Sequence, residues 1–360
     1  MSVGILLNHS MGVPKSLVIL EGNTLHGDLV GSSITPYYTG SYSTHNATWN
    51  DGVYVTIGSN SGAVYAWGEL SKAVDFTKYH ELRITCDYNA ATAGSTSNVS
   101  FYVGYASATG TSFAASYNFE SGTGTATFDI SNLTGSYYLK CRVSTSAWER
   151  SARVSKIELI RYTESDFQEV EYIASSGTQH IDTGFTPDNN TRVACEIMWT
   201  EFNNSYLGGF GAAQAYNSRA FESYVWASYV NWNFYSNTYG ADGGLGYAGT
   251  VNTRYLIDAN KNVFTISNTS GTVLKTITAT NGTFTAPYTM YLFGTHRATS
   301  GHAKCRFYGH TYIYDNGTLV REFVPCYRKS DGVIGMWDKV NKQFYTNGGS
   351  GTFTKGGDVT

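Results

Sequence analysis

Apolar and polar residues alternate with a period of two along most of this chain, and helical periodicity is nearly absent. Clear examples are the segments 53–57, 98–103 and 156–160. Asn-Gly pairs at 281–282 and 316–317 carry the residues that two-residue hairpin turns favour. Short strands separated by turn residues at intervals of about ten are typical of β-sandwiches and barrels. We therefore predict an all-β fold of tandem antiparallel β-sandwiches.

The amino-acid composition argues against two classes of binding partner, nucleic acids and membranes. Charged residues make up 14% of the 360 residues, and the formal net charge is −3. Nucleic-acid binding depends on clustered Lys and Arg, and the sequence contains no basic run. No stretch approaches the roughly 18 consecutive apolar residues that a membrane-spanning helix needs. We expect neither a nucleic-acid partner nor membrane insertion.

The cysteines indicate a reducing place of assembly. The chain has five of them, at Cys86, Cys141, Cys195, Cys305 and Cys326. Their odd number, wide spacing and lack of a CxxC pair argue against a disulfide framework or a zinc site. No basic segment precedes the first apolar run, so we predict no signal peptide. The expected state is buried, reduced thiols in a protein assembled inside a cell.

A polar stretch near residue 162 divides the chain. We predict an amino-terminal attachment segment or added strand at 1–20 and a first sandwich at 21–162. A linker is expected at 163–168, and a second sandwich at 169–357.

The second unit carries the more specific sequence pattern. It opens with VEYIASSGTQHIDTGF at 170–185 and closes with FVPCYRKSDGVIGMWD at 323–338, followed by FYTN at 344–347 and GTF at 351–353. Both ends resemble the concanavalin A-like, laminin-G-type jelly rolls of gut phages and bacterial surface proteins. The resemblance implies that fold for roughly half of the chain. Sugar binding is often assigned to such domains by fold analogy alone.

The first unit is less distinctive. Its segment AVDFTKY at 73–79, leading into LRI at 82–84, is similar to the strand entry of carbohydrate-binding modules, and 128–139 fits their late strands. Similar pairs of domains occur in phage head fibres, tail fibres and other structural proteins. The resemblance therefore implies a virion protein, assembled in the host cytoplasm and exposed on the particle surface. Its expected partners are other virion proteins, copies of itself in a homo-oligomer such as a trimer, and a host surface glycan.

Aromatic residues concentrate at 221–239, where eight occur in nineteen residues. Trp and Tyr rings can stack on sugar rings, while neighbouring Asn and Glu side chains bind hydroxyl groups. One face of a sandwich strand must be core, so about half of these rings are structural, and core or subunit packing is the alternative for each ring. We assign Tyr229, Trp232, Tyr235 and Tyr239 as exposed candidate carbohydrate-binding residues.

One motif suggests catalysis. Glu164, Asp166 and Glu169 reproduce the ExDxxE spacing of laminarinase-like glycoside hydrolases, in which the first and last carboxylates act as nucleophile and acid/base. In that family the motif lies on a central strand, whereas here it falls in the predicted linker, and Ser165 stands where the family has an apolar residue. We reject it as a catalytic site and predict a non-enzymatic protein.

Metal sites are weakly indicated. His296, His302 and His310 fall within fifteen residues but lack metal-site spacing, so we expect loop or surface histidines. Asp182, Asp331 and Asp338 could contribute to a calcium site, since jelly rolls of this kind sometimes bind calcium. No dense acidic loop supports that idea, and turn capping is the preferred interpretation. We predict no cofactor.

The leading hypothesis is a virion structural and adhesion protein, a fibre or decoration subunit. A glycan-cleaving depolymerase is one alternative, and it needs two carboxylates about 5–5.5 Å or about 6.5–9.5 Å apart across one cleft. A bacterial cell-surface adhesin whose signal has been removed is the other.

Overall fold

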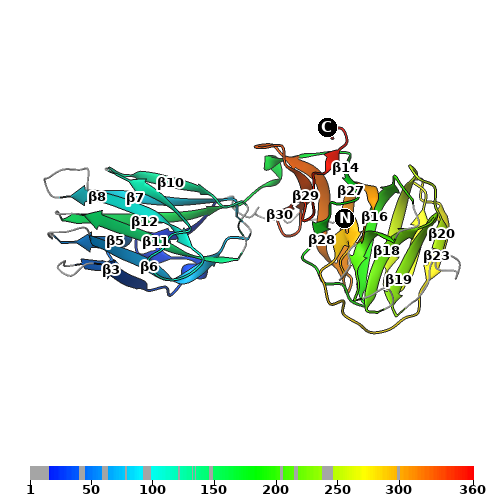
Figure 1. Cartoon of the computed structure of the whole chain (residues 1–360), viewed down its shortest axis with the longest axis horizontal. Helices are drawn as coiled ribbons and strands as arrows, with labels where there is room; N and C mark the ends of the chain where they lie inside the picture. Colours follow the sequence, from blue (N-terminus) through cyan, green and yellow to red (C-terminus); the bar gives the residue numbers. More distant parts are fainter. Residues whose placement is uncertain are drawn as a thin grey trace, which may run out of the picture. The chain divides into compact units, whose positions relative to one another are not determined.

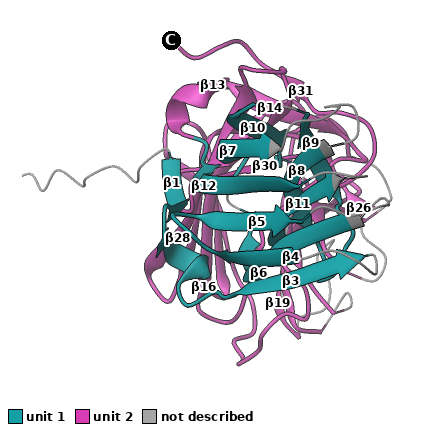
Figure 2. Cartoon of the chain, turned by 90° about the vertical axis from the view of Figure 1, so that its left-hand side faces the viewer, with its two compact units in different colours: residues 1–162 teal, residues 163–360 magenta. Residues whose placement is uncertain are grey.

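The computed structural model divides the chain into two compact units, residues 1–162 and 163–360 (Figures 1 and 2). It describes residues 16–39, 45–58, 64–77, 79–91, 99–120, 122–131, 133, 135–145, 149–202, 206–214, 218–236, 246–297 and 301–360. Within these residues the elements are strands and two short 3-10 turns, η1 (Gly27–Leu29) and η3 (Glu164–Asp166). No helix of the described chain is long and apolar enough to span a membrane. The all-β prediction is confirmed.

Unit 1 consists of a seven-stranded and a five-stranded antiparallel sheet. The seven-stranded sheet contains β1 (Ser16–Glu21), β2 (Thr24–Leu25), β4 (His45–Trp49), β5 (Val53–Ile57), β7 (Glu81–Ala91), β10 (Gly124–Asp129) and β12 (Arg150–Ile160). The five-stranded sheet contains β3 (Ile34–Thr39), β6 (Val64–Asp75), β8 (Val99–Ala106), β9 (Ala115–Phe119) and β11 (Ser136–Thr145). Alternate residues of both sheets form one apolar core, as period-two strands require.

The amino-terminal end of unit 1 is a strand. Residues 16–21, part of the predicted attachment segment or added strand, form β1, which pairs antiparallel with β12. Ile19 and Leu20 are buried in the core because their side chains lie against the facing sheet. Of the predicted segment 1–20, residues 1–15 lie outside the described part of the chain.

Unit 2 consists of an eleven-stranded and an eight-stranded sheet, here called the large and the small sheet. The large sheet contains β13 (Phe167–Glu169), β14 (Tyr172–Ser176), β16 (Thr191–Trp199), β21 (Arg254–Asn260), β22 (Val263–Ser267), β23 (Val273–Thr278), β27 (Lys304–Asp315), β28 (Thr318–Arg328), β29 (Ile334–Asp338), β30 (Gln343–Tyr345) and β31 (Thr354–Lys355). The small sheet contains β15 (Ile181–Asp182), β17 (Leu207–Ala212), β18 (Ala220–Trp226), β19 (Tyr229–Tyr235), β20 (Gly246–Ala248), β24 (Tyr291–Leu292), β25 (Gly294–Thr295) and β26 (Gly301–His302). Large apolar side chains from both sheets fill the core between them.

The segment 163–168 belongs to unit 2 instead of forming a linker. Phe167 begins β13, which pairs with β28, and its buried ring lies 4.7 Å from the ring of Trp337 and 4.7 Å from that of Phe344. A linker was expected because this stretch is polar, but Phe167 gives it an apolar anchor. The unit also continues past 357, since Val170 and Asp358 form an isolated bridge.

Candidate functional site

The aromatic segment of the sequence forms the antiparallel hairpin β18–β19 in the small sheet. Its register places Glu222 opposite Asn233 and Tyr224 opposite Asn231. Residues opposite each other in such a pair point to the same face of the sheet. The hairpin therefore has one face toward the core and one outer face, with different side chains on each.

The core-facing side of the hairpin is apolar. Phe221, Trp232 and Phe234 have 0% exposure, and the Trp232 ring stacks on Phe264 with 4.9 Å between centroids. The expectation that Trp232 is exposed is wrong. Side chains alternate between the two faces of β19. The Trp232 side chain points toward the large sheet, so its ring fills the core.

The other predicted rings have different environments. Tyr229 is half-buried and lies on the outer face of β19. Tyr235 is half-buried and packs against the core next to Phe284, because its backbone turns to φ 59° at the end of the strand. Tyr239 lies outside the described residues. Carbohydrate binding by these residues stays a prediction.

The outer face of the hairpin holds buried polar side chains that the sequence analysis did not assign as site residues. Glu222 and Asn231 have 0% exposure and Asn233 has 2%. Thr295 and Arg297, which are also buried, are among the groups that interact with Glu222. We call these five residues the polar layer. The alternation Asn-Trp-Asn-Phe at 231–234 was the sequence signal for it.

Glu222 is the acidic group of the polar layer. Asn233 donates a hydrogen bond from Nδ2 to Glu222 Oε1 at 2.9 Å. Burial raises the pKa of Glu222 above its ordinary value. Neighbouring hydrogen-bonding groups and the positive charge of Arg297 lower this pKa, but less than burial raises it; the hydrogen-bonding groups are Tyr206, Asn233 and Thr295.

Some acceptor atoms of the polar layer have no hydrogen bond among the described residues. Glu222 Oε2 and Asn231 Oδ1 are buried, and no hydrogen-bond partner for them occurs within the described part of the chain. The amide of Asn231 donates to the carbonyl of Tyr229 at 3.1 Å, so its oxygen is the free end of that side chain. Because both side chains have 0% exposure, a hydroxyl donor reaches these oxygens only after the groups that cover them move.

Aromatic rings flank the polar layer. Tyr206 stacks on Tyr224 with 3.9 Å between ring centroids, and the Arg297 guanidinium lies 3.7 Å from the Tyr206 ring centroid. Trp226, opposite Tyr229 in the hairpin, is 40% exposed. The outer face thus combines accessible rings with buried hydrogen-bonding groups.

Histidines of unit 2 form a stack of rings near the other edge of the small sheet. The order is Tyr288, His296, Tyr291, His180 and His302, with successive centroid distances of 4.7, 4.0, 4.0 and 5.0 Å. Burial and the neighbouring histidines lower the pKa of His180 to about 4. His296 and His302 are therefore packed, half-buried rings rather than free loop side chains.

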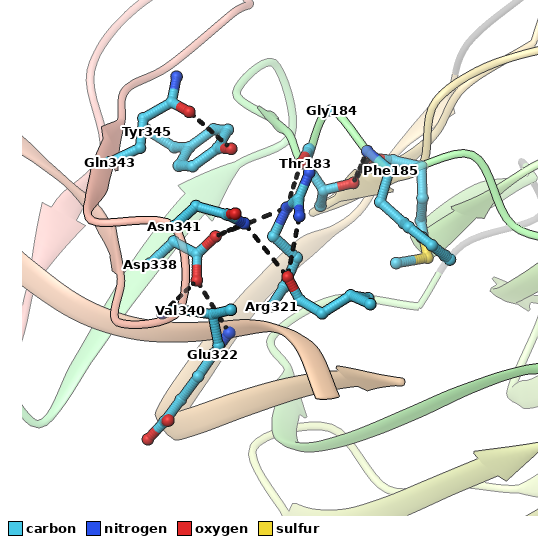
Figure 3. A network of polar contacts seen from close by, with 12 residues as sticks. Thr183, Gly184, Phe185, Arg321, Glu322, Asp338, Val340, Asn341, Gln343 and Tyr345 are labelled. Atoms are coloured by element: carbon cyan, nitrogen blue, oxygen red, sulfur yellow. Dashed lines mark hydrogen bonds and ion pairs between the residues drawn. The ribbon is translucent and has the colours of Figure 1, made fainter. Parts of the chain in front are cut away.

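The aspartates considered for calcium serve the backbone instead. Asp338 is fully buried, and its Oδ1 accepts the N–H groups of Glu322 and Val340, each at 3.0 Å (Figure 3). Its Oδ2 accepts Asn341 Nδ2 at 2.7 Å and lies 3.5 Å from Arg321 Nε. This network holds the β29–β30 turn against β28.

The other two aspartates cap turns at the surface. Asp182 accepts the N–H of Gly184 at 3.0 Å, and Asp331 accepts that of Val333 at 3.1 Å while pairing with Arg328. In the residues that the structure describes, no three His, Cys, Asp or Glu side chains gather to hold a metal.

The ExDxxE acids are engaged in local contacts. Glu164 pairs with Lys342 at 3.0 Å and Glu169 with Lys339 at 3.1 Å, while Asp166 caps the 3-10 turn η3. Comparison of the chain with protein-family models, with curated proteins and with solved structures finds no match. The outer face of the β18–β19 hairpin, not this motif, is the candidate functional site.

Proposed function

We propose that the chain is a non-enzymatic virion structural and adhesion protein that binds a host surface glycan through the outer face of the β18–β19 hairpin. The observation that carries this proposal is the polar layer around Glu222, which lies on the same face of the hairpin as the accessible ring of Trp226. Burying a carboxylate and two amides costs free energy unless they are hydrogen-bonded. A sandwich has no packing need for such groups outside its core, so a ligand-binding role explains them best.

The chemistry of this face suits a saccharide. Trp226 and Tyr229 offer ring faces for the C–H side of a sugar ring. When the groups that cover them move aside, Glu222 Oε2 and Asn231 Oδ1 can each accept a hydrogen bond from a hydroxyl group. A carboxylate acceptor makes the stronger of these bonds, because hydrogen bonds to ionised groups are stronger than those between neutral groups.

Adhesion without cleavage is favoured over a depolymerase. Glycoside hydrolysis uses a pair of carboxylates facing the scissile bond. Within the described residues, Glu222 is the one buried acid on the outer face of the small sheet. A single carboxylate supports binding but lacks the second group of a hydrolytic pair.

The virion part of the proposal draws on the sequence resemblance and on the thiols. All five cysteines are free and buried. Disulfides are rare in proteins that stay in reducing compartments, so free thiols agree with assembly in a host cytoplasm. Detection of the chain in purified phage particles would separate this proposal from a bacterial adhesin.

Glycan binding is tested on an array with the full-length chain, Trp226→Ala and Tyr117→Ala. Tyr117 is the matched control because it is a 49% exposed ring in unit 1. We expect Trp226→Ala to lose a defined set of glycans that the wild type and Tyr117→Ala retain. Absence of wild-type binding would contradict the proposal, and release of reducing ends from a bound glycan would favour the depolymerase.

Attachment to the particle is tested by removing residues 1–15 alone. Residues 16–20 have to stay, because β1 contributes Ile19 and Leu20 to the core of unit 1. We propose that the shortened chain folds but is not incorporated into particles. Normal incorporation would contradict an anchoring role for this segment.

A further inference from the structure

A concave feature lies on the outer face of the large sheet, outside the hairpin. It is a groove of about 350 Å³. Its lining side chains, from β16, β21 and β27, include Ala194, Glu196, Leu256, Tyr308, His310 and Tyr312. The volume lies near the lower end of the roughly 300–1,000 Å³ that small-molecule sites occupy.

The centre of β27, where the strand changes neighbours, lines the groove. The first half of the strand pairs with β14 as far as Tyr308, and its second half pairs with β28 from Thr311 onward. The register with β16 shifts at the same place, between Ala194 and Glu196. Gly309 has φ 50° there, and the space beside it is open. Ala194, at the register shift, contributes only a small side chain to this part of the surface.

The polar groups at the groove are held in fixed positions. His310 Nδ1 lies 2.8 Å from Glu322 Oε1, which leaves its Nε2 as the second ring nitrogen for a ligand. Glu196 forms an ion pair with Arg254, whose guanidinium lies 4.0 Å from the ring centroid of Tyr308. Such preordered groups lose little conformational entropy when a ligand binds.

We propose that this groove is a second carbohydrate site, which holds one sugar ring. Ala194 and Leu256 form an apolar floor, and the half-buried Tyr312 offers a ring to the C–H face of the sugar. Glu196 accepts and His310 exchanges hydrogen bonds with sugar hydroxyls. The site lies on the large sheet, so it is independent of the hairpin face and of whether that face binds a glycan.

The test follows the His310 imidazole signals of the full-length protein by NMR while free glucose, galactose, mannose and N-acetylglucosamine are added separately. His310→Gln assigns the signals. We expect at least one sugar to shift them saturably in the wild type and equally in Trp226→Ala. In Ala194→Trp, whose indole fills the groove, the shift is lost, whereas Ala194→Ser keeps it.

The proposal is overturned if none of the four sugars shifts the His310 signals, or if Ala194→Trp responds like the wild type. Tyr312→Leu is the second variant, needed if Ala194→Trp does not fold. It keeps an apolar surface but removes the ring, and we expect at least a tenfold weaker response. An unchanged response in Tyr312→Leu would also overturn the proposal.

Discussion

The carboxylate of Asp338 shows how one buried residue organises the end of the large sheet. Both of its oxygens accept hydrogen bonds, two from backbone N–H groups and one from Asn341. Asp338 is the last residue of the closing motif at 323–338, and these hydrogen bonds explain why an aspartate stands there. Glu222 differs, because one of its oxygens has no partner within the described part of the chain.

Replacing Asp338 by Asn should destabilise unit 2 strongly. The change puts an NH₂ group near backbone donors and leaves Arg321 without its buried counter-charge. We expect a loss of about 3 kcal/mol in the free energy of unfolding, measured by urea denaturation. The matched control Asp331→Asn, at a 41% exposed side chain that also caps a turn and pairs with an arginine, should cost less than about 1 kcal/mol. Equal losses of unfolding free energy in the two variants would contradict the idea that burial makes Asp338 the more important residue.

His180 should make stability depend on pH. Its pKa is about 4 in the folded chain and about 6.5 when unfolded, so the folded state disfavours protonation. Its contribution to stability is complete above about pH 6.5 and is lost as pH falls toward 4. For this partly exposed ring we expect a loss on the order of 1 kcal/mol. His180→Phe keeps a ring in the stack and should reduce the pH dependence of unfolding between pH 7 and 4; an unchanged profile would contradict the assignment.

At the scale of elements, period-two patterning predicted the strands but not which way each one faces. The burial pattern of β19 shows the reason, since five consecutive residues are buried. Trp232 is buried by the core, and Asn231 and Asn233 are buried on the opposite face. Sequence alternation gives two groups of positions, but the packing of the second sheet decides which group is core. The exposure predicted for Trp232 failed for this reason, and the polar layer was missed.

A buried ion pair holds a loop of unit 1 to two of its strands. Lys140 Nζ lies 2.8 Å from Glu69 Oε2, and it donates to the carbonyls of Ala108, Gly110 and Ser112 at 2.8, 2.8 and 3.1 Å. Lys140→Met leaves the Glu69 charge buried without its partner. We expect a destabilisation of unit 1 by about 3–5 kcal/mol, measured by denaturation. The double variant with Glu69→Gln should recover part of that loss; no recovery would show that the charge is not the cause.

At the scale of the whole molecule, the two units have separate cores with no residue in common. The polar stretch after β12 located this division in the sequence. The exact limits of the division could not be predicted. Phe167 packs against rings of unit 2 and so makes β13 part of that unit, and composition does not show this packing. The jelly-roll topology, the virion and the glycan remain predictions from resemblance.

Separate cores predict separate folding. We expect the fragment 163–360 to fold alone, with a cooperative thermal transition and the same transition temperature as unit 2 in the full chain. Lys140→Met in the full chain should then lower only the transition of unit 1. A fragment that is unfolded, as judged by circular dichroism and calorimetry, would contradict this division.

The central claim is that the polar layer contributes to glycan binding. The most direct test is calorimetric titration of the full-length wild type and Glu222→Gln with the glycan bound most tightly on the array. Gln keeps the shape of the side chain but removes the charge. The predicted result is an affinity about 10–100-fold lower, with an unfolding temperature that is not reduced. Equal affinities of the two proteins would contradict the account.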